Sequence, residues 1–324
     1  MKRSLLAVAL ATLGGLGSLQ AQDYPSRPLS MVVPFAAGGS FDVLGRVMSP
    51  RMSELLGQQV VIENPTGAAG ILGTLRVKNA EPDGYTFLLG SIGTHAYNPS
   101  IYKNLRYDPV NDFAPVGLFA DQPMVLIARK DFPASNLQEF IAYVRANAAK
   151  IQYGSAGVGS TTHLSCSLLT AAIGAQVTHI PYRGGGPAAQ DLLGGQIDYL
   201  CLNIGGGAPL ITNNSVKGIA TLSRERASIL PNLPTAHEQG LKDFDVSTWN
   251  AFFLPPRTPA AIVKKLNEVT SATIDTPAMR KRLEEIGVAP VAPERRSPEY
   301  LAKFIPEEIA RWAGPIKAAG IQVD

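Results

Sequence analysis

Three glycine-rich turns that carry hydroxyl groups are the parts of this sequence best suited to binding chemistry. Two of them, Pro34 to Asp42 (PFAAGGSFD) and Ser155 to His163 (SAGVGSTTH), follow a short apolar run and precede a segment of helical spacing. The third, Gly90 to His95 (GSIGTH), also follows an apolar run. Glycine lets the backbone approach a ligand closely, and a helix start exposes N–H groups with a partial positive charge. A single turn of this kind more often only caps the helix that follows it. Two such turns, each on a separate lobe of the protein, favour a site that holds an anion between them.

The candidate ligand contacts come from these turns and from two later strand ends. Arg183 precedes three glycines, where its guanidinium could fork onto a carboxylate, and Asn203 ends another apolar run. Asp198 is expected to brace a loop, and Trp249 fits a cleft wall or the core equally well. The full set of candidate contacts is Phe35, Ala37, Gly38, Gly39, Ser40, Phe41, Asp42, Ser91, Thr94, Ser155, Gly159, Ser160, Thr161, His163, Arg183 and Asn203.

Catalytic sites are less well supported by the same residues. Ser155 lacks the first glycine of a nucleophile elbow, because Tyr153 stands at that position. His163 could act as the base for Ser155 or Ser160, which keeps a secreted serine-type hydrolase as the alternative function. The phosphate-binding and dinucleotide glycine patterns are absent, and the four histidines lack metal-ligand spacing. We therefore expect no enzymatic activity, no cofactor and no metal. A surface adhesion or signalling module would need an exposed apolar patch, which the sequence does not reveal.

The elements that must position these turns are predicted to form two α/β lobes. Apolar runs alternate with helical segments as βαβαβ up to Leu89, and the alternation begins again after Phe119. This predicts mostly parallel sheets with helices on both faces. Three helices expected near Pro259, Pro277 and Ser297 have no new strands to cover, so we expect them to return to the first lobe. The expected organisation is a first lobe of residues 22–122 and 248–324, a second lobe of residues 123–247, and a hinge of two crossings at 119–129 and 245–254.

The N-terminus indicates export. Lys2 and Arg3 precede an uncharged run from Leu5 to Leu19, which is the layout of a secretory signal peptide at residues 1–21. The run is shorter than the roughly 20 residues of a membrane span, so we expect cleavage near Ala21 and a periplasmic protein. Removing these two cations lowers the formal charge from +3 to about +1. No basic patch remains that would favour a nucleic-acid partner.

Cys166 and Cys201 are the two cysteines of the chain. An oxidising compartment would allow them to pair. One lies in a predicted helix and the other in a predicted strand, so the sequence leaves the pairing open and favours free thiols.

A series of motifs in order resembles one family over essentially the whole mature chain: the extracytoplasmic receptors of tripartite tricarboxylate transporters, often called Bug receptors. The motifs are YPSRP at 24–28, VPFAAGG at 33–39 with Asp42, LGQ at 56–58 leading to EN at 63–64, GAAG at 67–70, PDGYT at 82–86, YGSAG at 153–157 with His163, and HIPYRG at 179–184. The resemblance implies an α/β periplasmic-binding-protein fold of the two-lobed, Venus-flytrap type II class. It also implies a monomer without cofactor that captures a small organic carboxylate for integral membrane transporter subunits. The Gly-Gly and Ser-Ala-Gly turns would hold the carboxylate through N–H groups and hydroxyls, and waters would bridge the far end of the ligand to the first lobe.

Two departures from the family pattern bear on the ligand. Phe41 stands where a small hydroxylated residue is common, and Pro65-Thr66 replaces the usual Arg-Pro. A phenyl ring beside the cleft would remove a donor and add a flat apolar face. Phe41 therefore suggests an aromatic carboxylate such as terephthalate, unless its ring packs away from the ligand.

Overall fold

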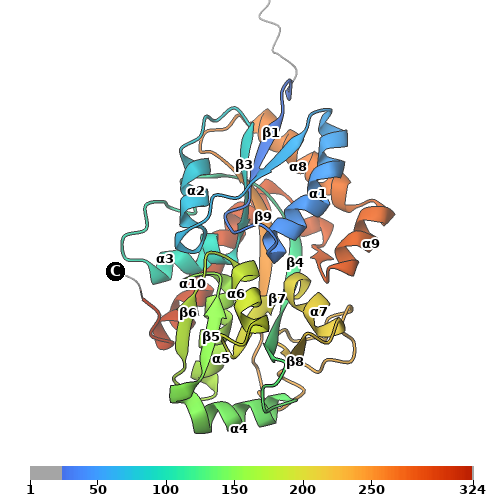
Figure 1. The fold of residues 1–324 in the computed structure, drawn as a ribbon. Coiled ribbons are helices and arrows are strands. Elements are labelled where there is room, and N and C mark those ends of the chain that lie inside the picture. The colour runs from blue at the N-terminus through green and yellow to red at the C-terminus, as the bar shows by residue number, and fades with distance from the viewer. Residues whose placement is uncertain (1–23, 323–324) are drawn as a thin grey trace, which may run out of the picture.

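Two lobes, one above the other in Figure 1, make up the molecule. The computed structural model describes residues 24–322, so the expected signal peptide and its cleavage near Ala21 lie outside the described residues. The blue N-terminal part and the orange C-terminal helices lie together in the upper lobe, and the green and yellow middle of the chain forms the lower lobe. One long strand, β4 (Ala114–Arg129), runs from the first lobe into the second. Within residues 24–322, no helix is long and apolar enough to cross a membrane.

The first lobe is built around six strands of the sheet, counting its half of β4. Its elements are β1 (Leu29–Val32), α1 (Ser40–Leu56), β2 (Val60–Glu63), η1 (Ala68–Gly70), α2 (Ile71–Lys78), β3 (Thr86–Ser91), η2 (Gly93–Tyr97), α3 (Asn98–Ile101), β9 (Ser247–Leu254), α8 (Ala260–Ile274), α9 (Pro277–Glu285), β10 (Ala289–Pro290), η4 (Pro293–Arg295) and α10 (Pro298–Ala318). The strand order is β2–β1–β3–β9–β4, with β1 parallel to both β2 and β3. β9 is antiparallel to β3 and β4, because it returns from the second lobe beside the outgoing β4.

The second lobe repeats the α/β plan with the other half of β4 at its edge. Its elements are α4 (Leu137–Asn147), η3 (Ala148–Lys150), β5 (Gln152–Ser155), α5 (Thr161–Ala172), β6 (Thr178–Pro181), α6 (Gly185–Leu193), β7 (Tyr199–Asn203), α7 (Ile204–Thr212) and β8 (Val216–Thr221). β5 is parallel to β6 and β7, whereas β7 and β8 are antiparallel to β4. Each parallel strand therefore leads through a short turn into a helix.

Each lobe has a hydrophobic cluster on either face of its sheet. Along β1, Met31 and Val33 join one first-lobe cluster and Val32 joins the other, because successive strand residues point to opposite faces. In the second lobe, Leu126 and Ile127 of β4 divide between two clusters in the same way. Burying one such side chain stabilises the fold by roughly 1.5–3 kcal/mol, so these clusters hold the turns at the strand ends in place.

α7 is an element that the sequence reading does not predict. Gly205, Gly206, Gly207 and Pro209 give this segment a low intrinsic helix propensity. Tertiary packing places the helix nonetheless. Gly207 lies so close to β4 that an added Cβ would be 2.7 Å from a methyl group of Val125. The two-residue strand β10, which pairs with β4, was also not expected after the last crossing.

Cys166 and Cys201 form a disulfide, which corrects the expectation of free thiols. Cys166 belongs to α5 and Cys201 to β7, and their Cα atoms are 5.5 Å apart, within the usual range for a disulfide. The expectation failed because α5 lies on β7, so that a helix residue and a strand residue face each other in one cluster.

Candidate functional site

Turns from both lobes meet at one place, which we call the interlobe seam: residues 34–40, 64–70 and 91–94 of the first lobe and residues 155–161 and 182–186 of the second. Each follows the carboxyl end of a parallel strand, where open α/β sheets bind ligands. The starts of α1 and α6 approach closely, since a Cβ added at Gly39 would be 3.7 Å from the nitrogen of Gly186. Because helix starts expose N–H groups, the seam favours an anion.

Direct contacts across the seam hold the lobes together in this structure. The Ala36 N–H donates a hydrogen bond to the Arg183 carbonyl at 3.4 Å, and the Tyr102 hydroxyl donates to the Val158 carbonyl. Gly184 is required for this approach, because a Cβ there would lie 2.9 Å from the Cβ of Ala36. The structure is thus a closed arrangement of the two lobes.

A pocket of about 380 Å³ opens between the lobes along the seam. Its lining residues are Phe35, Gly67, Ala68, Ala69, Gly70 and Tyr102 from the first lobe, and Ala156, Gly157, Val158, Pro181, Tyr182 and Arg183 from the second. Arg183 is the charged residue among them. The volume falls within the range of about 300–1,000 Å³ that small-molecule sites occupy.

Two buried hydroxyls beside Gly93 have no hydrogen-bond partner in the described part of the chain: Ser91 Oγ and Thr161 Oγ1. They come from opposite lobes, and a Cβ added at Gly93 would be 3.5 Å from the first and 3.2 Å from the second. Asn203, at the start of α7, likewise has an unpartnered amide nitrogen. Buried polar groups are nearly always hydrogen-bonded in native proteins. Free hydroxyls that converge from two lobes therefore mark a place where a ligand can supply the acceptor.

The crossing strands add two more polar groups that sequence reasoning missed. Asn250 of β9 is the register partner of Ser91, and Gln122 of β4 donates from its amide nitrogen to the Asn250 side-chain oxygen at 2.7 Å. Both residues are buried, and each keeps one side-chain polar atom without a partner among residues 24–322. A polar side chain on an otherwise apolar strand is the sequence signal that could have found them.

The carboxylate of Asp42 braces the first turn. Its carboxylate accepts hydrogen bonds from Gly38 N at 2.9 Å, Arg46 Nε at 2.8 Å and Asn64 Nδ2 at 3.2 Å. Burial raises the pKa of Asp42, but these hydrogen bonds and the Arg46 charge outweigh it and bring the pKa below its ordinary value. Both carboxylate oxygens are thus used within the protein, and a direct contact of Asp42 with the ligand stays a prediction.

Two further hydroxyls of the predicted set are also engaged within the protein. Ser160 Oγ accepts from His163 N at 3.2 Å, as the N-cap of α5, and donates to the Gly157 carbonyl at 2.7 Å. Thr94 Oγ1 accepts from Ser91 N and donates to the Ser91 carbonyl, both at 3.1 Å. Both side chains fix the shape of a turn, so the buried seam hydroxyls without a partner among residues 24–322 are those of Ser91 and Thr161.

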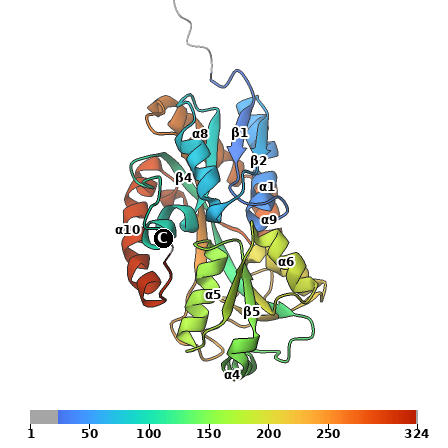
Figure 2. The same ribbon diagram turned by 60° about the vertical axis from the view of Figure 1, so that its left-hand side comes forward.

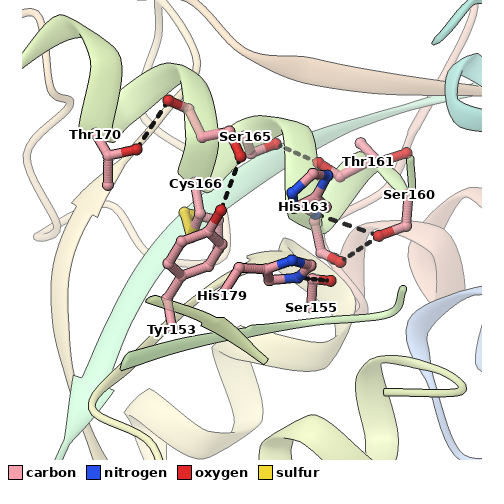
Figure 3. Close-up of a disulfide and its surroundings, with 12 residues drawn as sticks. Tyr153, Ser155, Ser160, Thr161, His163, Ser165, Cys166, Thr170 and His179 are labelled. Carbon is pink, nitrogen blue, oxygen red and sulfur yellow. Dashed lines mark hydrogen bonds between the residues drawn. A yellow bond between two sulfur atoms is a disulfide. The ribbon is translucent and has the colours of Figure 1, made fainter. Parts of the chain in front are cut away.

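Three stacked rings support the second-lobe turn from beneath (Figure 3). The His179 ring lies 4.1 Å from the His163 ring and 4.9 Å from the Tyr153 ring, centroid to centroid. His163 Nδ1 accepts from Gly159 N at 3.2 Å. Burial, together with the neighbouring His179, lowers the pKa of His163 to about 3, and burial lowers the pKa of His179 to about 4. Both imidazoles are therefore neutral at neutral pH.

Ser155 pairs with His179, which changes the geometry of the hydrolase alternative. Ser155 Oγ lies 2.6 Å from His179 Nε2, whereas the sequence reading assigned His163 as the base. In the described part of the chain no carboxylate is hydrogen-bonded to His179, and a histidine with a pKa of about 4 is a weak general base at neutral pH. The pair is better explained as a buried hydrogen bond that orients the turn. Among residues 24–322, no three His, Cys, Asp or Glu side chains gather closely enough to hold a metal ion.

Phe41 points into the first-lobe core. It is 7% exposed, belongs to the cluster beneath α1, and stacks on Phe35 with ring centroids 4.8 Å apart. Phe35, not Phe41, lines the pocket. The argument that Phe41 offers a flat face to the ligand therefore fails, because its position on α1 turns the ring towards the sheet.

The remaining predicted residues divide between the seam and its edges. Gly39 and Ser40 face the second lobe, since a Cβ at Gly206 would be 2.6 Å from Ser40 Oγ. Ala37 and Gly38 are exposed on the outer part of the turn. Gly159 is enclosed, because a Cβ there would be 2.8 Å from the Tyr102 ring.

Asp198 and Trp249 lie outside the predicted set of ligand contacts, and the structure shows what each of them does. Asp198 braces two strand ends where a loop was expected, by accepting from Gln152 N at 2.8 Å and from Arg129 Nε at 3.0 Å. Trp249 is a core residue, with its indole N–H bonded to Glu308 at 2.9 Å.

The GAAG turn at 67–70 lines the pocket, although none of its residues is among the predicted contacts. Its four residues have positive φ angles of 140°, 43°, 49° and 87°. Ala68 and Ala69 are thus held in the left-handed region, which is costly for residues with a Cβ and is often found at functional sites. The signal was present in the sequence, because this turn also joins a parallel strand to a helix.

Comparisons with solved structures agree with this geometry. The periplasmic binding protein BugD is 40% identical, with a TM-score of 0.89, and the match covers 92% of this chain and 99% of that one. MatC from Rhodopseudomonas palustris, solved with bound malate, is 40% identical, with a TM-score of 0.87 over 90% of this chain and 100% of that one. Rpa4515 from R. palustris, solved with adipate, is 34% identical, with a TM-score of 0.89 over 93% and 99% of the two chains.

A family model gives the same assignment by an independent route. The model of the tripartite tricarboxylate transporter family receptor matches residues 44–321, which begin after the 34–40 turn, extend across both lobes and contain the second-lobe half of the seam. Together with the two-lobed fold and the donor groups at the seam, this match places the chain among solute-binding receptors for small carboxylates. The protein belongs to the tripartite tricarboxylate transporter receptor family, as its motifs indicated.

Proposed function

We propose that this receptor is exported to the periplasm, binds a small dicarboxylate in the interlobe seam and delivers it to the membrane subunits of a tripartite tricarboxylate transporter. The observation that carries the proposal is the pair of buried, unpartnered hydroxyls of Ser91 and Thr161, which converge from opposite lobes at Gly93. One carboxylate would accept from these hydroxyls and from N–H groups at the start of α5. Closure around the ligand would use the two crossings at 119–129 and 245–254 as a hinge, and the receptor would act as a monomer.

Arg183 supports a second carboxylate on the ligand. It is the charged residue among the lining residues of the pocket, and its backbone is anchored by the Ala36 N–H. A guanidinium at the rim can bind the far carboxylate in a fork geometry. Two relatives with similar folds were solved with malate and with adipate, which are both dicarboxylates.

The test is a calorimetric titration of ligand-free protein with succinate, malate and adipate, and with butyrate as the monocarboxylate control. Arg183→Gln should weaken dicarboxylate binding about tenfold, as expected for one charge-assisted contact, and leave butyrate binding unchanged. Arg282→Gln, an exposed arginine on α9, is the matched control and should change neither. Equal losses for both ligand classes would contradict the role of Arg183. No binding of any dicarboxylate would contradict the proposed function.

The more specific hypothesis is that the ligand is an aromatic dicarboxylate such as terephthalate. It now depends on Phe35, because this aromatic residue lines the pocket. Terephthalate should bind at least as tightly as adipate if the Phe35 ring stacks on the ligand. Phe35→Leu should then weaken terephthalate binding more than adipate binding. A preference for adipate in the native protein would discard the aromatic hypothesis and keep the receptor.

A further inference from the structure

α5 is packed into the cores of both lobes. Leu164 belongs to the first-lobe cluster that contains Trp249 and Trp312, whereas Leu169 and Ile173 belong to the second-lobe cluster. The turn that leads into this helix carries the second-lobe half of the seam, and Thr161 is its first helical residue. The position of Thr161 and of the second-lobe turn therefore depends on whether α5 moves with the first lobe or with the second.

The contact between α5 and the first lobe runs along α10. In Figure 2, α10 descends the flank of the molecule towards α5. A groove of about 450 Å³ lies between the two helices, lined by Leu168 of α5, Trp312 and Pro315 of α10, and the segment Asp243 to Val246 that leads into the second crossing. Leu168 also packs against clusters of both lobes. Leu164 and Leu168 thus give α5 apolar contacts with the first lobe, in addition to those that Leu169 and Ile173 make with the second.

Within the described part of the chain, one disulfide cross-links α5 of the second lobe to β7 of the same lobe. Cys166 lies five residues after Thr161 on α5, and Cys201 lies two residues before Asn203 on β7. Both cysteines are 0% exposed, so the bond is shielded from solvent on the sheet side of α5. Figure 3 shows Cys166 on the same helix as Thr161 and His163.

We propose that the Cys166–Cys201 disulfide is a positioning element that keeps α5 on the second lobe when the lobes separate. Thr161 and Asn203, which both carry unpartnered polar groups, then remain one preassembled half of the ligand site. Without the bond, α5 alternates between an arrangement packed on α10 and an arrangement packed on β7. The fraction of open protein that is ready to bind falls, and the apparent affinity falls by the same factor. This inference rests on the proposed function, because it assumes that a ligand is captured between separating lobes.

The first arm of the test needs no ligand. Hydrogen exchange is compared between oxidised protein and wild-type protein refolded with a reductant, which keeps both cysteine side chains and removes only the bond. The expected result is that the α5 amides from 164 to 172 exchange at least tenfold faster in the reduced protein, while the amides of α4 do not change. If amide exchange became equally faster in α4 and α5, the disulfide would stabilise the whole lobe and not α5 in particular. That result, or unchanged exchange in both helices, would overturn the proposal.

The second arm measures binding, with adipate as the probe. Reduced wild type and Cys166→Ala/Cys201→Ala should both bind about tenfold more weakly than oxidised wild type. Val144→Ala, which truncates the same cluster on α4, is the control for lost stability and should keep the wild-type affinity. Wild-type affinity in both untethered forms, or the same loss in Val144→Ala, would overturn the positioning role. If adipate and the other dicarboxylates bind to no form, the proposed function fails, and the exchange arm still decides whether the disulfide holds α5.

Discussion

The two halves of the interlobe seam are held in shape by different interactions. In the first lobe, the carboxylate of Asp42 draws Gly38, Arg46 and Asn64 around one turn. In the second lobe, the turn rests on a stack of neutral rings and on a helix bound by a disulfide. The first arrangement is ionic and largely local, and the second is apolar and long-range.

The difference has a consequence for binding a carboxylate. Arg46 compensates the negative charge of Asp42, and burial keeps His163 and His179 uncharged at neutral pH. Both halves therefore present N–H and O–H donors without a net charge close to the buried hydroxyls. Such donors bind an anion strongly when water is excluded, because the acceptor is charged.

Removing the ionic brace should produce the largest effect. Asp42→Ala leaves Gly38 N and Asn64 Nδ2 without their acceptor, so we expect a loss of roughly 3 kcal/mol in the free energy of unfolding and weaker ligand binding. Denaturant titration measures the first and calorimetry the second. Asp83→Ala breaks an exposed ion pair with Arg27 and should cost less than about 1 kcal/mol. Equal costs for the two variants would show that Asp42 is not a brace.

The buried histidines of the second-lobe turn predict a pH dependence between pH 7 and pH 5, a range in which the Asp42 carboxyl, with a pKa below its ordinary value, does not titrate. The pKa of His163 is lowered to about 3 in the folded protein, against an ordinary value of 6.5. Below pH 6.5 the unfolded chain takes up a proton that the native state does not, so stability falls as the pH falls, by about 1.4 kcal/mol per unit for this residue.

His163→Asn keeps an acceptor for Gly159 N but cannot titrate. Between pH 7 and pH 5 it should lose about 2 kcal/mol less unfolding free energy than the wild type. Urea unfolding at a series of pH values measures the difference. Parallel pH profiles for the two proteins would contradict the neutral state of His163.

The strained turn of the first lobe should give the smallest effect. Ala68 has φ = 43° and is exposed, so Ala68→Gly relieves the left-handed strain and should stabilise the protein by up to about 1 kcal/mol. The same substitution at Ala313, an exposed position inside α10, should destabilise it by roughly 0.5–1 kcal/mol. Thermal unfolding of both variants provides the comparison, and changes of the same sign would refute the strain assignment.

Much of the fold could be predicted because its signals are local. The apolar run Val60 to Glu63 forms β2, and α1 ends where Gly57 takes a left-handed φ of 67°. The turns after parallel strands were predicted as binding elements for the same reason, since strand, glycine turn and helix follow one another directly. α7 was missed because its glycines and proline oppose a helix that only packing against β4 favours.

The sequence by itself determined the alternation of strands and helices, the family motifs and the position of the glycine turns along the chain. The tertiary structure decided which side chains those turns leave free. Ser160, Thr94 and Asp42 bond within their own turns, while Ser91 and Thr161 meet across the lobes.

It also decided that Ser155 pairs with His179, 24 residues away, and Cys166 with Cys201, 35 residues away. The physical reason is that local patterns depend on neighbours a few residues apart, whereas these pairings depend on which helix face packs on which strand.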